Sequence, residues 1–556
     1  MLAILIFFIL ITITSPYIGK YISYIYSENP NPLQPKENKI IKWCLNDDFK
    51  EQTWVNYTKS LIFFNILGFC FLFLILIFQN SLPLNFHNLP NLSIDQAFNI
   101  SASYVTNTNW QSLNPEHNLS NFTQIVGLGV QNFLAPATSI SLAIALIRGI
   151  TRENSNYIGN FYQDMFSAII YILIPLSIIS GMILISQGVP QNFSNDIIVN
   201  TIEDVQQIFP QGPIASQTAI SLIGNNGGGF FNSGFSHPYQ NPTPFTNMIE
   251  IFLVLLLPSS FIFAYAKLIN NSKHGWTLYI TFSVILLIST FIMYNFEKQM
   301  VPWNDIKANL INFEGKELKN KLIESVLWTS VNTATSSGAL NSDLDSYTPL
   351  AIMMAFINLM LGGVIFGSVG TGICNIIIYM VIALFLSGLM IGKTPEFLGK
   401  KLGTKEISFS MIILLVLPVL SLVLSSITIL VVSDNLSINK GPHYLTQIIY
   451  TFVSTLSNNG SSMKGLETNI EYFNIILGLC MLAGRFIPII LILMLSGIML
   501  KKRRVQSSIC NVPEHGIQFG VIISLTIALI GGLTFFPILC VGPILEHLIL
   551  NSNNLF

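Results

Sequence analysis

Residues 216–232, SQTAISLIGNNGGGFFN, join a short apolar segment to a cluster of asparagine and glycine. The apolar part is long enough for about three helical turns, which is roughly half the thickness of a membrane. The cluster that follows favours turns and left-handed backbone rather than helix. Backbone that leaves a regular helix inside a bilayer costs several kcal/mol per unsatisfied group unless it lines a polar path. The stretch therefore predicts a half-length helix that ends at a polar path within a membrane.

The same unit recurs three more times along the chain. Its other clusters are TNTNWQ at 106–111, TATSSGALN at 333–341 and TLSNNGSSMKGL at 455–466. The segments before them read DQAFNISASYV, ESVLWTSVNTATS and TQIIYTFVSTLSN. Aligning Thr106, Asn226, Ser337 and Asn459 gives a period of 111 to 122 residues, which fits one helix, one re-entrant segment and a second helix. A glycine triplet alone is typical of helix packing, but four matching clusters predict a pore.

The composition places these units in a membrane. Hydrophobic residues make up 51% of the chain and charged residues 10%, whereas roughly 25% of residues are charged in soluble proteins. The net charge of −1 leaves no basic face for nucleic acid, so nucleic-acid binding is excluded. Ten apolar runs are long enough to span a bilayer. They cover residues 2–19, 60–79, 122–147, 165–187, 248–269, 277–294, 348–391, 407–433, 473–499 and 517–546.

The predicted fold is an all-α polytopic membrane protein with ten transmembrane helices, in which four helix–pore loop–helix repeats surround a pseudo-fourfold axis. One extra helix stands at each end, and the first is retained rather than cleaved as a signal peptide. The run 348–391 is too long for one crossing and rich in glycine, which predicts a broken helix. The predicted units are 1–59 (N-terminal helix and cytoplasmic loop), the repeats 60–164, 165–276, 277–406 and 407–515, and 516–556 (C-terminal helix).

The positive charges predict the orientation of the chain. With the N-terminus outside, the loops on the inner side carry 18 Lys and Arg, and those on the outer side carry six. Lys and Arg are retained on the cytoplasmic side. We therefore expect both termini and all four clusters on the outer side.

The four clusters are suited to coordinating a dehydrated monovalent cation, because backbone carbonyls around one axis can replace its hydration shell. Gly227, Gly228, Gly338 and Gly460 allow positive φ, and Asn107 takes the equivalent place in the first copy. The partly negative C-terminal ends of the half-helices also favour a cation. Hydroxyl groups that add ligands or brace the loops come from Thr106, Thr108, Thr335, Ser336, Ser337 and Ser461.

Several charged residues in or near the clusters and apolar runs have two possible roles. Arg485 lies near the middle of an apolar run, at a cost of about 2.5 to 3.5 kcal/mol, which predicts a role in the ion path, with snorkelling to a headgroup as the alternative. Lys464 either approaches the pore mouth or stays in solvent. Asp95, Glu116, Asp343 and Asp345 either concentrate cations outside or are solvated loop charges. The seven His are predicted to be unpartnered loop residues, and the six Cys buried apolar filler.

The order and spacing of these motifs resemble the A subunit of the bacterial Kdp potassium-transporting ATPases, in the superfamily of K⁺ transporters. The resemblance covers essentially the whole chain, through TNTNWQ, NNGGGFFN with HPYQNPTPFTN, SSGALN, LGGVIFGSVGTG and SNNGSSMKGL with LAGRF. It implies a non-catalytic protein that selects K⁺ and uses no organic cofactor. It also implies that ATP is hydrolysed by a partner, the P-type ATPase or B subunit. The C subunit, together with a small single-helix subunit, would complete the complex in the lipid of the bacterial inner (plasma) membrane.

The resemblance also implies a set of site residues. Arg485 would lie below the filter, and the break at Gly363, Gly367 and Gly370 would block direct passage inward, so that K⁺ leaves through an intramembrane tunnel. Gly234 and Gly363 depart from the family's pattern, which has Asn and Glu there. The alternatives are a stand-alone K⁺ channel or ion-coupled transporter, or a structural scaffold. The implied K⁺ ligands are Thr106, Asn107, Thr108, Asn109, Gln111, Asn225, Asn226, Gly227, Gly228, Thr335, Ser336, Ser337, Gly338, Asn458, Asn459, Gly460 and Ser461.

Overall fold

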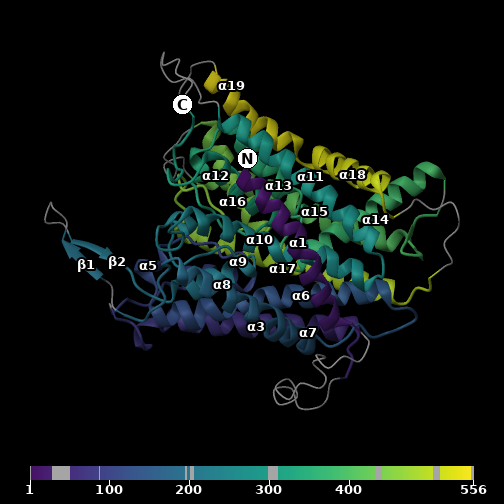
Figure 1. Ribbon diagram of the computed structural model, residues 1–556, viewed down its shortest axis with the longest axis horizontal. Helices are drawn as coiled ribbons and strands as arrows, with labels where there is room; N and C mark the ends of the chain where they lie inside the picture. Colours follow the sequence, from purple (N-terminus) through teal and green to yellow (C-terminus); the bar gives the residue numbers. More distant parts are fainter. Residues whose placement is uncertain are drawn as a thin grey trace.

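Long apolar helices form the body of the molecule (Figure 1). The computed structural model describes residues 2–27, 50–86, 88–194, 197–200, 206–298, 311–392, 394–432, 441–504 and 514–551. In these residues ten helices are long and apolar enough to cross a membrane, which confirms the predicted number. They are α1 (Leu2–Tyr26), α3 (Trp54–Ile77), η3 with α6 (Thr123–Gly129, Val130–Thr151), α7 with η4 and α8 (Phe161–Ser167, Ala168–Leu173, Ile174–Ser186), α10 (Pro244–Leu268), α11 (Ser272–Glu297), α14 (Thr371–Ile391), α15 (Thr404–Val431), α17 (Glu471–Leu500) and α18 (Ile517–Leu539).

Four shorter helices lie between pairs of these long helices, as predicted. They are α4 (Ile94–Val105), α9 (Ile214–Ile223), α12 (Leu322–Thr335) and α16 (Pro442–Leu456). Most of their side chains are buried, including polar ones such as Ser103, Thr218 and Asn332. Each short helix ends at one of the four polar clusters, so the long helices form a frame that holds the clusters in the interior of the bundle.

The predicted broken helix consists of α13 (Pro349–Met360), a loop at 361–370 and α14. This loop contains left-handed backbone at Gly362, Gly363, Gly367 and Gly370, with φ of 67°, 66°, 66° and 79°. A Cβ atom at Gly370 would lie 2.3 Å from the carbonyl oxygen of Ser139 on α6. Only glycine fits this contact, which holds the loop against the neighbouring helix.

The remaining elements are short and connect or cap the helices. The strands β1 (Ile197–Asn200) and β2 (Gln206–Phe209) form one antiparallel pair, and β3 (Glu396–Phe397) and β4 (Lys400–Lys401) form another. The short helices are η2 (Gln79–Ser81), α5 (Pro115–Asn118), η5 (Gly234–Ser236), η6 (Leu344–Ser346), η8 (Cys540–Ile544) and α19 (Leu545–Asn551). Of the described cysteines, Cys374 and Cys480 are buried as predicted, whereas Cys70 is exposed and Cys540 is only partly buried. Cys44 and Cys510 lie outside the described residues.

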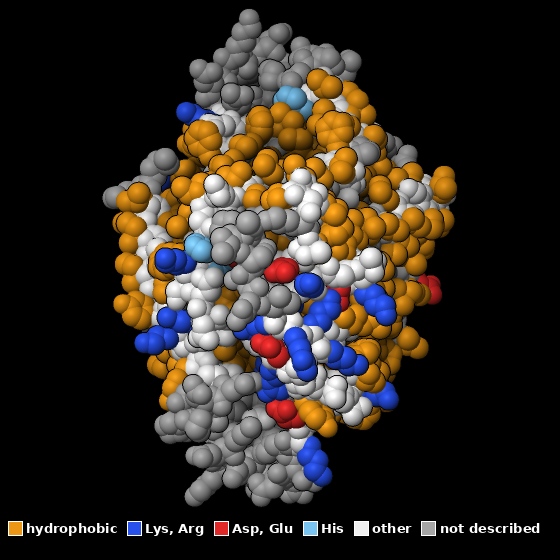
Figure 2. Space-filling model, turned by 90° about the vertical axis from the view of Figure 1, so that its right-hand side faces the viewer, with side chains coloured by type: hydrophobic (Ala, Val, Ile, Leu, Met, Phe, Trp, Pro, Cys, Tyr) orange, Lys and Arg blue, Asp and Glu red, His pale blue; other side chains and the backbone are white. Residues whose placement is uncertain are grey.

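Basic residues gather at the end of the bundle opposite the clusters. Figure 2 shows this end, where Lys and Arg side chains lie over the centre and hydrophobic side chains surround them. Here Lys502 pairs with Glu406 at 2.7 Å. Lys400 Nζ donates to the carbonyl oxygens of Gly149 at 3.1 Å and Met499 at 2.8 Å, which caps the C-terminal ends of α6 and α17.

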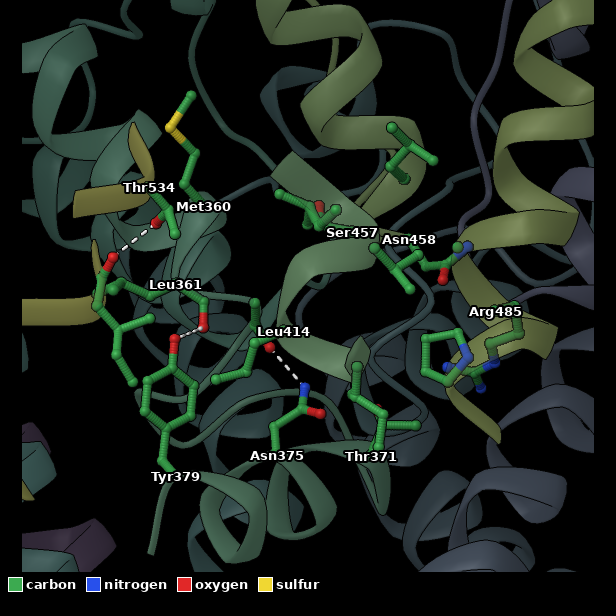
Figure 3. A pocket seen from close by; sticks show the side chains of 18 of the residues that line it. Met360, Leu361, Thr371, Asn375, Tyr379, Leu414, Ser457, Asn458, Arg485 and Thr534 are labelled. Carbon is green, nitrogen blue, oxygen red and sulfur yellow. Dashed lines mark hydrogen bonds between the residues drawn. The ribbon is translucent and has the colours of Figure 1, made fainter. Parts of the chain in front are cut away.

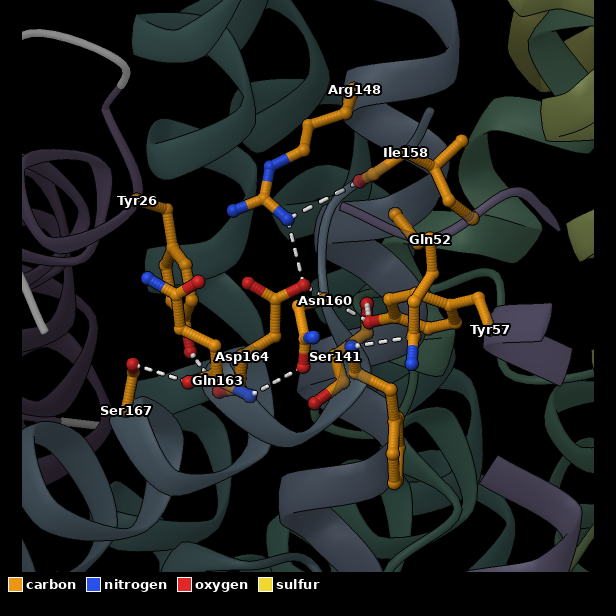
Figure 4. A network of polar contacts seen from close by, with 12 residues as sticks. Tyr26, Gln52, Tyr57, Ser141, Arg148, Ile158, Asn160, Gln163, Asp164 and Ser167 are labelled. Carbon is orange, nitrogen blue, oxygen red and sulfur yellow. Dashed lines mark hydrogen bonds and ion pairs between the residues drawn. The ribbon is translucent and has the colours of Figure 1, made fainter. Parts of the chain in front are cut away.

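A buried ion pair near this end ties four helices together (Figure 4). The Asp164 carboxylate on α7 accepts from Arg148 Nη1 on α6 at 2.7 Å and from the Tyr57 hydroxyl on α3 at 3.1 Å. The hydroxyl of Tyr26, the last residue of α1, donates to the Asp164 carbonyl oxygen at 3.1 Å. Every charge in this network is compensated, so the network fixes how α1 meets α3, α6 and α7.

We expect Asp164→Asn to lower the free energy of unfolding by about 3 kcal/mol, because it leaves the Arg148 charge buried without a counter-charge. Thermal unfolding in detergent measures this effect. Glu51→Gln is the control, since Glu51 pairs with Arg152 but its side chain is 43% exposed, and exposed pairs contribute about 0 to 1 kcal/mol. Equal losses in the two variants would contradict the prediction.

Candidate ion-binding site

The four clusters share an alternating backbone. In each one, two residues separated by a single residue have positive φ. Such alternation between left- and right-handed backbone turns successive carbonyl groups toward one side of the strand. The pairs are Asn107 and Asn109 (62° and 50°), Asn225 and Gly227 (51° and 88°), Ser336 and Gly338 (51° and 79°), and Asn458 and Gly460 (54° and 92°). We call these clusters loops 1 to 4, in chain order.

One hydrogen bond recurs in all four loops and fixes their alignment. The backbone N–H between the two left-handed residues donates to the carbonyl oxygen five residues earlier, in the last turn of the half-helix. The four bonds run from Thr108 to Ser103 (2.9 Å), from Asn226 to Ser221 (2.8 Å), from Ser337 to Asn332 (3.2 Å) and from Asn459 to Ser454 (2.9 Å).

This alignment corrects the sequence prediction at two points. In loop 1, Thr108 rather than Thr106 corresponds to Asn226, and Asn109 rather than Asn107 takes the place of the glycines. The segment TNTN reads the same after a shift of two residues, so the sequence alone left the register ambiguous. In loop 2, Gly227 has positive φ and Gly228 does not.

The loops contact one another in chain order and form a closed ring. A Cβ atom at Gly227 would lie 1.6 Å from the carbonyl oxygen of Ser337 in the next loop. The equivalent distances are 2.2 Å from Gly338 to the Asn459 oxygen and 1.9 Å from Gly460 to the Thr108 oxygen. Loop 1 meets loop 2 through Asn107 Nδ2, which donates to the carbonyl oxygens of Gly224 and Asn225 at 3.2 and 3.1 Å. Glycine is thus required where the backbones of adjacent loops touch.

Asparagine side chains hold the ring from behind. Asn132 on α6 accepts at Oδ1 from Asn109 Nδ2 at 2.9 Å and from Asn226 Nδ2 at 3.1 Å. On the other side, Asn332 on α12 accepts from Asn459 Nδ2 at 3.2 Å. The sequence did not single out Asn132 or Asn332 as supports of the ring, since their partners Asn226 and Asn459 lie 94 and 127 residues away in the sequence.

Most of the predicted side-chain ligands brace the loops. The hydroxyls of Thr106 and Thr335 donate back to their own half-helices at 2.8 and 2.7 Å. Ser461 Oγ bonds to the Tyr450 hydroxyl at 2.7 Å, and Gln111 Nε2 donates to the Gly229 carbonyl oxygen at 2.8 Å. Asn458 Nδ2 donates to Thr108 Oγ1 at 2.9 Å. Backbone carbonyls are therefore the main candidates for ion ligands.

A cavity of about 60 Å³ opens above the ring and is lined by all four loops, through Asn109, Gly227, Gly338 and Gly460. Asp343 and the exposed Lys464 also line it. Burial raises the pKa of the Asp343 carboxyl. The other acids predicted near the mouth accept hydrogen bonds from protein groups: Asp95 from Asn474, Glu116 from the backbone of Asn232, and Asp345 from Gln447.

A second cavity, of about 100 Å³, lies below loop 4 (Figure 3). Its lining includes Asn458, Gly362 from the broken helix, and Arg485 from α17. The loop at 361–370 reaches under the ring, since a Cβ atom at Gly363 would lie 3.2 Å from Ser336 Oγ. Arg485 is 5% exposed and donates from Nη2 to Ser139 Oγ. It therefore lies inside the bundle and does not snorkel to the surface.

Comparison with known proteins identifies the family. The family model described as the potassium-transporting ATPase A subunit matches residues 5–548. The chain belongs to this family.

Curated relatives from this family match the chain over almost its full length. The potassium-transporting ATPase potassium-binding subunit of Hydrogenobaculum sp. (strain Y04AAS1) is 42% identical, over 98% of this chain and 97% of that protein. The protein of the same name from Rhodospirillum centenum is 39% identical, over 100% and 98%. Among solved structures, the potassium transporter TrkH from Vibrio parahaemolyticus has a similar fold, with a TM-score of 0.54 at 14% identity, over 82% of this chain and 89% of that chain.

The protein holds its α19 helix to the ring through a histidine that the sequence analysis had assigned to a loop. His443, at the start of α16, has Nδ1 2.8 Å from Glu546 Oε1 on α19 and Nε2 3.0 Å from Asp345 Oδ1. Asp345 also packs against loop 4, because a Cβ atom at Gly465 would lie 2.0 Å from its Oδ2. The two acids are about 100 residues from His443, so no local spacing could reveal the cluster.

We expect this cluster to make stability depend on pH. Burial disfavours the charged imidazole, but the hydrogen bonds and charges of Asp345 and Glu546 outweigh it and raise the pKa of His443 from 6.5 to about 9. A raised folded-state pKa contributes stability that is complete below pH 6.5 and lost as the pH rises through about 9. Unfolding temperatures measured from pH 6 to 10 should decrease as the pH rises from 6.5 through about 9. His443→Gln should remove this decrease. An unchanged pH profile in the variant would assign the dependence to other groups.

Proposed function

We propose that this chain binds K⁺ from the outer side through the ring of loops 1 to 4 and passes it to a P-type ATPase partner for ATP-driven uptake. The observation that carries the proposal is the fourfold pair of positive φ angles, with glycine packed against the next loop's carbonyl at three of the four contacts. Four strands of carbonyl groups around one axis suit a dehydrated monovalent cation. The names of the curated relatives, potassium-binding subunits of a potassium-transporting ATPase, support K⁺ as that cation.

We infer that the backbone oxygens around the recurring position of each loop are the ligands. That position is Thr108, Asn226, Ser337 and Asn459, and its neighbours on either side complete the set. The side chains then hold the ring to one diameter rather than contact the ion. Gln111 and Ser461 act from the rim, through bonds to Gly229 and Tyr450.

The path beyond the ring leads into the lower cavity. The loop at 361–370, with Gly363, Gly367 and Gly370, lies beneath Ser336 and obstructs a straight route inward. The cavity extends sideways between α14, α15, α17 and α18. We propose that K⁺ turns there and leaves within the membrane toward the ATPase partner, and that the charge of Arg485 limits its passage.

The same proposal covers the assembly and its place in the cell. ATP hydrolysis belongs to the P-type ATPase, the B subunit. The C subunit, together with a small single-helix subunit, completes the complex in the bacterial inner membrane. Both termini lie outside, and the chain divides into four repeats at 60–164, 165–276, 277–406 and 407–515, with one extra helix at each end. The basic residues gathered at one end of the bundle support this orientation.

A transport assay tests the proposal. The chain is purified with its copurifying partners, placed in liposomes and supplied with ATP under a K⁺ gradient that opposes uptake. We expect K⁺ uptake only with ATP and only with the ATPase partner present. Passive, potential-driven K⁺ flux through the chain alone would support a channel or ion-coupled transporter instead. A purified chain with no measurable K⁺ binding would point to a structural scaffold.

A further inference from the structure

Glu250 on α10 is a buried acid without a partner. It is fully buried, and neither carboxyl oxygen has a hydrogen-bond partner among the described residues. Three other buried acids in the described part of the chain have a basic partner: Glu297 pairs with Lys316 at 2.8 Å, Asp164 with Arg148 and Glu406 with Lys502. An ionised carboxylate with no partner costs several kcal/mol in such a place. The presence of such a carboxyl calls for a function other than packing.

The position of Glu250 is fixed by the residues one turn away on the same face of α10. Asn247 Oδ1 accepts from Nδ2 of Asn341, the last residue of loop 3, at 2.8 Å. The carbonyl oxygen of Val254 lies 2.8 Å from the side-chain amide of Asn225 in loop 2. Glu250 lies between these two contacts. It is therefore behind the ring, at the depth of loops 2 and 3.

The charges that face Glu250 are few. Lys319 supplies the opposite charge that acts on it, but its Nζ donates to the Asn241 carbonyl oxygen instead. On α12 the charged residue is Glu324, and α9 has no ionisable side chain. α1 runs alongside α10, with Ser15 bonded to Ser259. The first ionisable side chain of α1, Tyr17, therefore lies about three helical turns from the level of Glu250. The other ionisable groups on the helices packed against α10 are Tyr17, Lys20, Tyr21, Tyr24, Tyr26, Arg148, Lys273, His274, Tyr279, Tyr294, Glu297, Cys374 and Tyr379.

We propose that Glu250 is a proton site coupled to the ring, which holds a proton when the ring is empty and releases it when K⁺ binds. The carboxyl O–H bond breaks, its electron pair stays on the carboxylate, and the positive charge of K⁺ in the ring replaces that of the proton. The proton is taken up by water at the outer surface, on the side of Glu250 where Asn247, Asn241 and the half-buried Lys319 follow one another. The inference rests on the proposed binding of K⁺ by the ring.

The expected coupling is large enough to measure. Two unit charges about 10 Å apart, at an effective dielectric constant of about 20, change each other's binding roughly tenfold. Because the coupling is reciprocal, K⁺ affinity should rise roughly tenfold with pH as the proton is lost. Neutralising Glu250 permanently should leave the low affinity at every pH.

The test is K⁺ binding by the purified complex, titrated with potassium chloride in buffers of different protonation enthalpy over a range of pH. We expect the wild-type complex to release protons as K⁺ binds. Glu250→Gln should bind K⁺ about tenfold more weakly at high pH, without dependence on pH and without proton release, whereas Glu250→Asp should keep both. Glu324→Gln, which neutralises a buried acid on the adjacent α12, is the matched control and should behave as wild type.

A K⁺-induced infrared difference spectrum adds a direct readout. The band of a protonated carboxyl should disappear when K⁺ binds to the wild-type complex, and Glu250→Gln should lack that change. If that variant does not assemble, the wild-type proton release and infrared band decide by themselves. Proton release from Glu250→Gln equal to wild type, or no release from wild type, would overturn the inference and leave K⁺ binding by the ring intact. Absence of K⁺ binding in the wild type would instead refute the proposed function.

Discussion

Gly227→Ala is expected to weaken K⁺ binding on the order of 100-fold and to abolish discrimination between K⁺ and Na⁺. The added Cβ atom would lie 1.6 Å from the Ser337 carbonyl oxygen, which is backbone and cannot rotate away as a side chain could. Loop 3 must move. Its contact with loop 4, where Gly338 packs against the Asn459 carbonyl oxygen, then changes as well. The left-handed φ of 88° adds a penalty of about 1 to 2 kcal/mol for alanine. Competition of Na⁺ and Rb⁺ with K⁺ in binding assays measures the effect.

Gly188→Ala is the matched control for this prediction. Gly188 has a φ of 95° and nothing within 4 Å of an added Cβ atom. It therefore carries the same type of backbone penalty without the collision. Equal changes in ion discrimination in the two variants would show that general destabilisation, and not the ring, is responsible. A folded Gly227→Ala protein with wild-type discrimination would contradict the assignment of the ring as the filter.

Arg485→Met is expected to raise passive K⁺ leak through the assembled complex and to lower ATP-driven uptake, each by roughly tenfold or more. A guanidinium group repels a K⁺ ion about 8 Å away by about 2 kcal/mol at an effective dielectric constant of about 20. Arg485 lines the cavity that an ion must enter after the ring. Removing its charge therefore lowers the barrier for ions that are not being pumped. K⁺ flux in liposomes with and without ATP separates the two effects.

Arg485→Lys keeps the charge and should leak far less than Arg485→Met. K⁺ binding by the ring should survive in both variants, because Arg485 bonds to Ser139 and to none of the four loops. Loss of the Arg485→Met protein from the membrane would show that the arginine is needed for folding. An unchanged leak in a folded variant would remove it from the ion path.

The sequence predicted the half-helices and the broken helix because their signals are local. An apolar segment of half the membrane's thickness followed by asparagine and glycine has few other solutions in a bilayer. The glycines at 362, 363, 367 and 370 interrupt an overlong apolar run in the same manner. Ten spans followed from apolar length alone.

The details of the site depend on contacts that sequence does not show. The register of loop 1 required the hydrogen bond from Thr108 to Ser103, since TNTN fits in two ways. Asn226, a partner of Asn132, and Glu546, a partner of His443, lie about 100 residues away in the sequence. Asn109, the second partner of Asn132, is closer. Glu250 differs from these residues, because neither of its carboxyl oxygens has a hydrogen-bond partner among the described residues. A lone glutamate in an apolar helix gives no sign of which side of the helix it occupies.

Asn109 stands where the other three quadrants have glycine, and this difference reflects a fourfold arrangement built from one polypeptide. In a tetramer of identical chains, every substitution appears four times and each quadrant must accept the same residue. Here the four quadrants belong to one chain, so each quadrant can change alone. A substitution that would disrupt all four quadrants of a symmetric assembly then changes only one of them. Experiments can therefore alter the ring one position at a time.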